Sequence, residues 1–193
     1  MPRGLTVSAL ASLAFVTFAI AECHSGTGLP SGPDVNIVDT VSLYALDGTP
    51  IDLPSGLIIA SSPHDVRTDQ TADFDFAFNL VGGKALLLPT GAMQLGVGSG
   101  IQHQNTTFDA IAVAPGGVYV DSVPDTLQVG TVAVIHSRPL SAGSVTVCLS
   151  GIGYFYAKLQ VMAIDTLARR IDMLFLADQN CGYKSLEPGN PTQ

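Results

Sequence analysis

The chemistry that this chain could perform depends first on its four histidines and three cysteines. The histidines show no short spacing of the kind that binds zinc; they are His24, His64, His103 and His136. A catalytic serine is no better supported, because Ser99 lies in a glycine-rich stretch with the wrong spacing for a nucleophile elbow. The sequence therefore predicts a protein that is not an enzyme and carries no cofactor.

Aspartates in predicted loops offer a second chemistry, the binding of calcium. Calcium prefers flexible cages of oxygen ligands, which such carboxylates could supply. The candidates are Asp65, Asp69, Asp73, Asp121 and Asp125. No calcium-loop consensus is present, and aspartate is also common in the turns of all-β proteins. Calcium binding is accordingly an alternative and not the leading expectation.

Two of the cysteines are placed to form a disulfide bond. Cys148 ends a strand-like run that begins at Val145, and Cys181 follows the last strand-like run of the chain. In an oxidising compartment a Cys148–Cys181 disulfide is expected, with two unpaired buried thiols as the alternative. Cys23 is left over, and it is either a candidate site of lipidation or a free thiol near a membrane.

Residues 1–21 have the pattern of an export signal. Arg3 precedes an uncharged apolar run, and a small-residue cleavage site ends at Ala21. Cleavage would give a secreted protein, whereas retention would leave a membrane anchor shorter than the ~30 Å hydrocarbon core requires. Lipidation of Cys23 is a third interpretation, although Glu22 stands where a bacterial lipoprotein signal has a small residue. All three place the rest of the chain outside the cytoplasm, in the periplasm.

The composition indicates one folded, acidic domain. Hydrophobic residues make up 47% of the chain and charged residues 12%, which excludes a disordered protein. The formal net charge is −8. Binding to nucleic acid is disfavoured because phosphate contacts need clustered lysines and arginines. The length that remains after residues 1–21 suits a single domain.

Alternation of apolar and polar residues predicts strands along most of the chain. Residues 73–80 place three phenylalanines on one face, with Asp73, Asp75 and Asn79 on a face expected to be wet. Further strands are predicted at residues 37–46, 57–60, 85–88, 108–114, 118–123, 127–135 and 144–149. The clearest unit is a hairpin made of residues 155–164 and 171–177, joined by a loop at residues 166–169.

About nine such strands predict an all-β fold, an antiparallel β-sandwich after an N-terminal hydrophobic helix. A closed β-barrel is the alternative. The sandwich is expected to span residues 36–184. A linker rich in glycine, serine and proline precedes it at residues 22–35, and a tail with two prolines follows at residues 185–193.

One face of the last hairpin is the candidate protein-contact surface. Tyr154 and Tyr156 share this face with Met162, and Leu174 and Leu176 lie nearby. Tyrosine and methionine are enriched at protein–protein interfaces. The alternative is that a second sheet packs there. Sugar binding is less favoured, because the chain has no tryptophan and only five tyrosines to form stacking platforms.

Parts of the chain resemble uncharacterised secreted or lipoprotein-like β-rich proteins of Gram-negative bacteria. The stretches that carry the resemblance are residues 159–165, residues 178–183, Ser185 and Pro188-Gly189, and residues 36–46 are similar to the first strand of those proteins. The resemblance implies an extracytoplasmic location and supplies no catalytic residues. It also implies a place among extrinsic subunits of membrane complexes, such as photosynthetic or respiratory assemblies.

The leading expectation is a non-enzymatic, membrane-tethered β-sandwich that binds or stabilises a larger protein assembly. Its partners would be other protein subunits and, through the N-terminus, the membrane. A secreted module that binds a ligand or calcium is the alternative from a different class.

Overall fold

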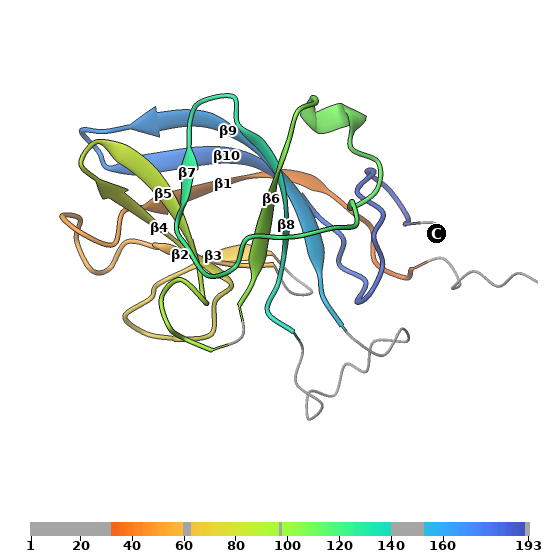
Figure 1. Cartoon of the computed structure of the whole chain (residues 1–193), viewed down its shortest axis with the longest axis horizontal. Helices are drawn as coiled ribbons and strands as arrows, with labels where there is room; N and C mark the ends of the chain where they lie inside the picture. The colour runs from red at the N-terminus through yellow and green to blue at the C-terminus, as the bar shows by residue number, and fades with distance from the viewer. Residues whose placement is uncertain (1–31, 60–62, 97, 140–152, 192–193) are drawn as a thin grey trace, which may run out of the picture.

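Two antiparallel sheets of five strands face each other in the computed structural model, which describes residues 32–59, 63–96, 98–139 and 153–191 (Figure 1). The first sheet has the order β1 (Val38–Tyr44), β10 (Arg170–Ala177), β9 (Tyr156–Asp165), β8 (Val132–His136) and β6 (Gly100–Gln104). The second has the order β3 (His64–Val66), β2 (Gly56–Ile58), β4 (Phe76–Val81), β5 (Lys84–Pro89) and β7 (Asp125–Leu127). The predicted β-sandwich is confirmed, and the described strands do not close into a barrel.

The predicted C-terminal hairpin is confirmed as β9 and β10, which pair from Asp165↔Arg170 to Ala157↔Ala177. Its loop ends at Arg169, which adopts a left-handed backbone conformation with φ 54°. The Arg169 guanidinium donates hydrogen bonds to the carbonyl oxygens of Asp47 at 2.7 Å and Leu80 at 2.8 Å. The hairpin loop is therefore fastened to the second sheet.

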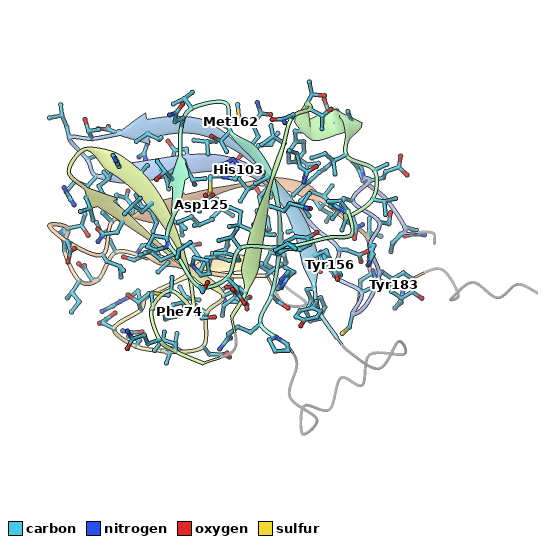
Figure 2. All side chains as sticks on the ribbon, viewed as in Figure 1. Phe74, His103, Asp125, Tyr156, Met162 and Tyr183 are labelled. Atoms are coloured by element: carbon cyan, nitrogen blue, oxygen red, sulfur yellow. The ribbon has the colours of Figure 1, made fainter. Side chains whose placement is uncertain are left out.

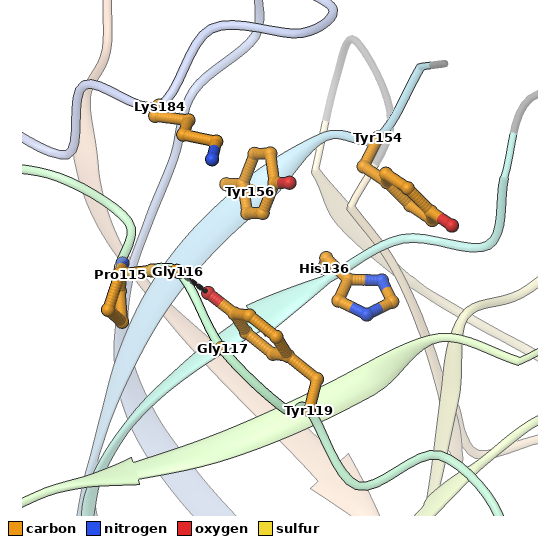
Figure 3. Close-up of a pocket in the computed structure, with 8 residues that line it drawn as sticks. All are labelled: Pro115, Gly116, Gly117, Tyr119, His136, Tyr154, Tyr156 and Lys184. Atoms are coloured by element: carbon orange, nitrogen blue, oxygen red, sulfur yellow. Dashed lines mark hydrogen bonds between the residues drawn. The ribbon is translucent and has the colours of Figure 1, made fainter.

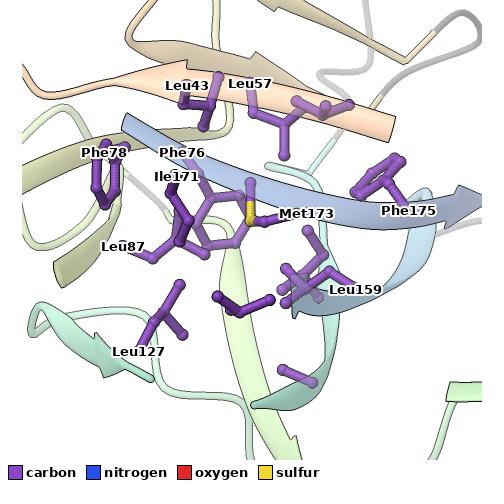
Figure 4. Close-up of a cluster of buried hydrophobic side chains, with 14 of the residues drawn as sticks. Leu43, Leu57, Phe76, Phe78, Leu87, Leu127, Leu159, Ile171, Met173 and Phe175 are labelled. Carbon is purple, nitrogen blue, oxygen red and sulfur yellow. The ribbon is translucent and has the colours of Figure 1, made fainter. Parts of the chain in front are cut away.

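The main hydrophobic core lies between the two sheets (Figure 4). The second sheet contributes Phe76, Phe78 and Leu87, and the first contributes Leu159, Ile171, Met173 and Phe175, all of them at most 2% exposed. The phenylalanine face predicted for residues 73–80 is therefore correct. The other face of that stretch was predicted to be wet. Asp73 is exposed as predicted, but the prediction was wrong for Asp75, which is 3% exposed, and for Asn79, which is 8% exposed.

Hydrogen-bond partners inside the protein explain why Asp75 and Asn79 can be buried. The Asn79 amide donates to the Asp47 carboxylate at 2.7 Å, and its oxygen accepts from the Leu80 N–H at 2.8 Å. The Asp75 carboxylate accepts hydrogen bonds from backbone and side-chain donors of other segments. Buried polar groups are tolerated when they are hydrogen-bonded in this way.

Three predicted strands differ from the structure. Residues 108–114 begin with a single 3₁₀ turn, η1 (Phe108–Ala110), and residues 118–123 make only an isolated bridge between Val120 and Ile101. Residues 127–135 are divided between β7 and β8 by a turn at Gly130, whose φ is 87°. The predicted strand at residues 144–149 lies outside the described residues.

Phe108, Ile111 and Ala114 from the first of these segments, with Tyr119 from the second, cover part of the outer face of the first sheet. We call residues 105–120 the strap and residues 183–189 the C-terminal segment; they pair through hydrogen bonds from Ala114 N to Lys184 O and from Leu186 N to Ala112 O, both 2.7 Å. A second apolar cluster joins them to the sheet: Phe108, Ile111, Ala114, Val132, Val134, Leu176 and Leu186. The sandwich thus carries a partial third layer (Figure 1).

Lys158 connects the strap to the first sheet through hydrogen bonds. Lys158, in β9, is 2% exposed, and its Nζ donates to the carbonyl oxygens of Phe108 and Ile111, each at 2.9 Å. The ammonium also lies 4.5 Å from the centre of the Phe108 ring, a cation–π contact. Burial lowers the pKa of Lys158.

The two ends of the described chain meet on the domain. Leu186 is fully buried, and Asn36 forms a bridge with Gly189. Residues 185–191 therefore pack on the sandwich, in contrast to the predicted tail. The predicted leader at residues 1–21, Cys23 and most of the linker lie outside the described residues. Within the part that the structure describes, no helix is long and apolar enough to cross a membrane.

Cys181 is partly buried against the main core, whereas Cys148 lies outside the described residues. The Cys148–Cys181 disulfide stays a prediction. We expect non-reducing peptide mapping by mass spectrometry of the oxidised chain to yield one linked peptide containing both cysteines, which reduction separates. Recovery of both as alkylated free thiols without prior reduction would contradict it. A Cys23→Ser variant is the control, because it should leave the linked peptide unchanged.

Candidate functional site

The five residues of the predicted contact face are separated in the structure. Leu176 is fully buried, and Leu174 packs against the apolar cluster beneath the strap. Met162 is 52% exposed near one end of β9, while Tyr156 lies near the other (Figure 2). They do not form one open surface, because the strap covers its middle. The alternative was that a second sheet packs on this face. The two leucines are indeed covered by another layer, but that layer is irregular and is not a sheet.

Tyr154 and Tyr156 instead line a pocket of about 280 Å³ (Figure 3). Four segments that are distant in the sequence form its walls. The lining residues are Pro115, Gly116, Gly117 and Tyr119 from the strap, His136 from the end of β8, Tyr154 and Tyr156 from the start of β9, and Lys184 from the C-terminal segment. The third layer therefore creates the pocket by closing over the outer face of the first sheet.

Local geometry holds the strap side of the pocket in place. The Tyr119 hydroxyl donates to the Pro115 carbonyl oxygen at 2.9 Å, which closes a short loop through Gly116 and Gly117. Gly117 has φ 115°, a conformation that other residues rarely adopt. Across the pocket wall, a Cβ on Gly100 would lie 2.6 Å from the Tyr119 Cβ, so glycine is needed for this close approach.

The aromatic rings form a continuous wall. The His136 ring packs between Tyr119 and Tyr154, with centroid distances of 4.8 and 4.6 Å and interplanar angles of 66° and 62°. Such edge-on contacts are the favoured geometry for aromatic pairs. Tyr156 stands 6.3 to 6.4 Å from all three rings. Lys184 Nζ lies 5.6 Å from the centre of the Tyr156 ring.

The protonation states give the wall a defined set of donors and acceptors. Burial lowers the pKa of His136, so its imidazole is neutral at pH 7. Its Nδ1 lies 2.8 Å from the Ser137 carbonyl oxygen, which assigns the proton to Nδ1 and leaves Nε2 as an acceptor. Burial raises the pKa of Tyr119 and Tyr156, so both hydroxyls stay protonated.

The other candidates for chemistry are engaged elsewhere. Ser99 is fully buried, and its Oγ donates to the Asp75 carbonyl oxygen, so it is not placed as a nucleophile. His103 Nε2 lies 2.5 Å from the carboxylate of Asp125 (Figure 2), and His64 is in β3. His24 lies outside the described residues.

The aspartates proposed as calcium ligands do not converge. Asp69 pairs with Arg67 at 2.8 Å, and Asp73 pairs with Arg138. Among the residues that the structure describes, no three histidine, cysteine, aspartate or glutamate side chains come together in a way that could hold a metal ion.

Tyr119 and Lys184 were not singled out from the sequence, and His136 was considered only as one of four histidines without zinc spacing. A local signal that could have pointed to the place is the glycine pair at residues 116–117, where the chain bends around the pocket. Comparison of the chain with protein-family models, with curated proteins and with solved structures gave no match. The pocket is therefore the basis on which a function can be proposed.

Proposed function

We propose that this chain is a non-enzymatic binding module that holds a small ligand in the aromatic pocket. The observation that supports it is the gathering of four aromatic rings and one lysine from separate segments around a single cavity. Ligand sites are typically concave, with aromatic walls and a few polar groups that fix the orientation of the ligand. At about 280 Å³ the cavity suits a small molecule or one ring of a larger one.

The lining is suited to binding rather than to catalysis. The hydroxyls of Tyr119 and Tyr156 stay protonated because burial raises their pKa, the His136 ring is neutral because burial lowers its pKa, and Lys184 faces an aromatic ring. No carboxylate is among the lining residues to orient His136 as a general base. These features favour ligand binding as the role of the pocket.

The larger-assembly hypothesis stays a prediction. One of its grounds was an outward face of the last hairpin, and the strap covers the leucines of that face. Its other grounds, the predicted anchor and the flexible linker, lie mostly outside the described residues. The extracytoplasmic location and the membrane tether also stay predictions, because the predicted export signal and Cys23 lie outside the described residues. The likeness to secreted or lipoprotein-like proteins of Gram-negative bacteria stays a prediction as well, because no comparison gave a match. The ligand-binding alternative is favoured because it has a built cavity.

A fragment screen by nitrogen-15 NMR on the full chain tests the proposal. We expect small polar ring compounds to shift the amide signals of Gly116 and Gly117, which line the pocket. The amide signals of Gly82 and Gly83 should stay unchanged, because these glycines lie in the exposed turn between β4 and β5. A library of several hundred compounds that never moves the two strap glycines would refute the ligand site.

A further inference from the structure

The polar atoms of the pocket can both donate and accept hydrogen bonds. Lys184 supplies donors, whereas Nε2 of His136 lies against Gly100, where an added Cβ would stand 2.5 Å from it. The hydroxyls of Tyr154 and Tyr156 make no hydrogen bond within the described part of the chain, so each can serve as donor or acceptor. A ligand that satisfies this set carries several hydroxyl groups, because a carboxylate would use the donors alone and a quaternary ammonium would use the ring faces alone.

The aromatic wall adds an apolar component to the same site. Tyr154, His136 and Tyr119 lie in contact in a row, with Tyr156 beside them (Figure 3). Tyrosine combines an apolar ring with a polar tip, so it can pack against the C–H face of a ligand and hydrogen-bond at its edge. Sugar rings present this combination of an apolar face and a hydroxylated edge.

The charge of the protein further restricts the class of ligand that the pocket could bind. The formal net charge is −8, and a charge of that sign repels anionic ligands over long range. Asp121 is near enough to act electrostatically on His136, so negative charge also lies beside the pocket. Lys184 is the only cationic residue among the lining residues. A neutral ligand is therefore favoured over a polyanionic one.

From these observations we propose that the pocket binds one ring of a neutral saccharide, an inference that rests on the proposed function of the pocket. The cavity of about 280 Å³ accommodates a single ring. The sequence argued against sugar binding because the chain lacks tryptophan and has only five tyrosines. In the folded chain, however, three of the five tyrosines lie together in one wall of the pocket.

The test is a titration of the full chain with defined probes, followed through the amides of Gly116 and Gly117. The neutral probes are maltose, cellobiose and N,N′-diacetylchitobiose. Galacturonate is the anionic sugar, and benzoate and tetramethylammonium are the two probes that are not sugars. We expect saturable shifts with at least one neutral disaccharide and weaker or no shifts with the other three. The absence of tryptophan makes tyrosine fluorescence a second, independent readout.

Variants locate the sugar in the pocket. Tyr154→Ala should weaken saccharide binding about tenfold or more, because it removes one end of the aromatic wall. Tyr156→Phe removes only a hydroxyl and should weaken it by about 2- to 12-fold, the equivalent of one hydrogen bond, while leaving the fold intact. Tyr44→Ala on the edge strand β1 is the matched control and should change affinity by less than about twofold.

The outcomes separate the two proposals. Shifts with benzoate or tetramethylammonium and none with any saccharide would overturn the saccharide assignment and leave the ligand site standing. Galacturonate binding more tightly than every neutral disaccharide would overturn the preference for a neutral sugar. No response to any probe would count against both proposals. Saccharide affinity that is unchanged in Tyr154→Ala and Tyr156→Phe would place the sugar outside the pocket and likewise overturn the assignment.

Discussion

Replacing Asp75 with alanine is expected to lower the free energy of unfolding by about 3–5 kcal/mol, the cost of breaking a buried ion pair by removing one partner. The Asp75 carboxylate is 3% exposed, and its Oδ2 accepts from the Ile59 backbone N–H at 2.8 Å. Oδ1 of Asp75 accepts from two donors of Arg138, the backbone N–H at 2.8 Å and the side-chain Nε at 3.2 Å. One side chain thus satisfies three donors.

These donors come from both sheets of the sandwich. Ile59 follows β2 in the second sheet, and Arg138 follows β8 in the first. The Asp75 carbonyl oxygen also accepts from Ser99 Oγ, just before β6. Removing the carboxylate leaves two backbone amides and a guanidinium without this acceptor, and each unsatisfied buried donor costs about 1–3 kcal/mol.

Urea unfolding followed by circular dichroism measures the effect, and Asp73→Ala is the matched control. Asp73 also pairs with Arg138, but its side chain is 80% exposed, so its loss should cost at most about 1 kcal/mol. The loss of stability in Asp75→Asn should lie between those of the two alanine variants, because asparagine keeps one acceptor oxygen. Equal, small losses in Asp75→Ala and Asp73→Ala would show that Asp75 does not tie the sheets together.

Alternation of residue types predicted the sandwich because one side of nearly every strand faces the core. It could not predict that Asp75 and Asn79 are buried as well. A polar residue that is hydrogen-bonded inside the protein has the same place in an alternating pattern as one in water. The partners that allow its burial, such as Arg138 for Asp75, lie far along the chain and leave no local signal.

The strap shows a second limit of the same pattern. Residues 108–114 and 118–123 alternate like strands, yet neither segment forms a strand of the sandwich. The first covers the outer face of a sheet through Phe108, Ile111 and Ala114, whereas Val118, Val120 and Val123 of the second are 83%, 41% and 53% exposed. A period of two therefore guarantees neither strand pairing nor burial of the apolar side. Pro115, Gly116 and Gly117 interrupt the run, and proline cannot donate to a ladder. The pocket follows from this tertiary arrangement, so its residues could not be grouped from sequence.

Replacing Lys158 with methionine is expected to lower the free energy of unfolding by about 3 kcal/mol. Methionine keeps much of the volume of the lysine stem, but it leaves the carbonyl oxygens of Phe108 and Ile111 without their donor. Each orphaned buried acceptor costs about 1–3 kcal/mol, partly offset because a charge is no longer desolvated. Urea unfolding measures the loss, and Lys84→Met, at the exposed first position of β5, should change the free energy of unfolding by less than about 0.5 kcal/mol.

The pH dependence of the stability difference between the wild-type chain and Lys158→Met shows whether the Lys158 ammonium is buried or solvated. Burial lowers the pKa of Lys158 in the native state, against the opposing pull of the Asp109 and Glu187 carboxylates, while the unfolded chain keeps the ordinary value of 10.5. Between the two pKa values the unfolded state binds more protons, so this group makes the protein more stable as pH rises. Neutral lysine still has N–H donors for both carbonyls. The stability lost in Lys158→Met should therefore grow from neutral pH toward 10.5, and a difference that stays flat or shrinks would mean that the ammonium is solvated.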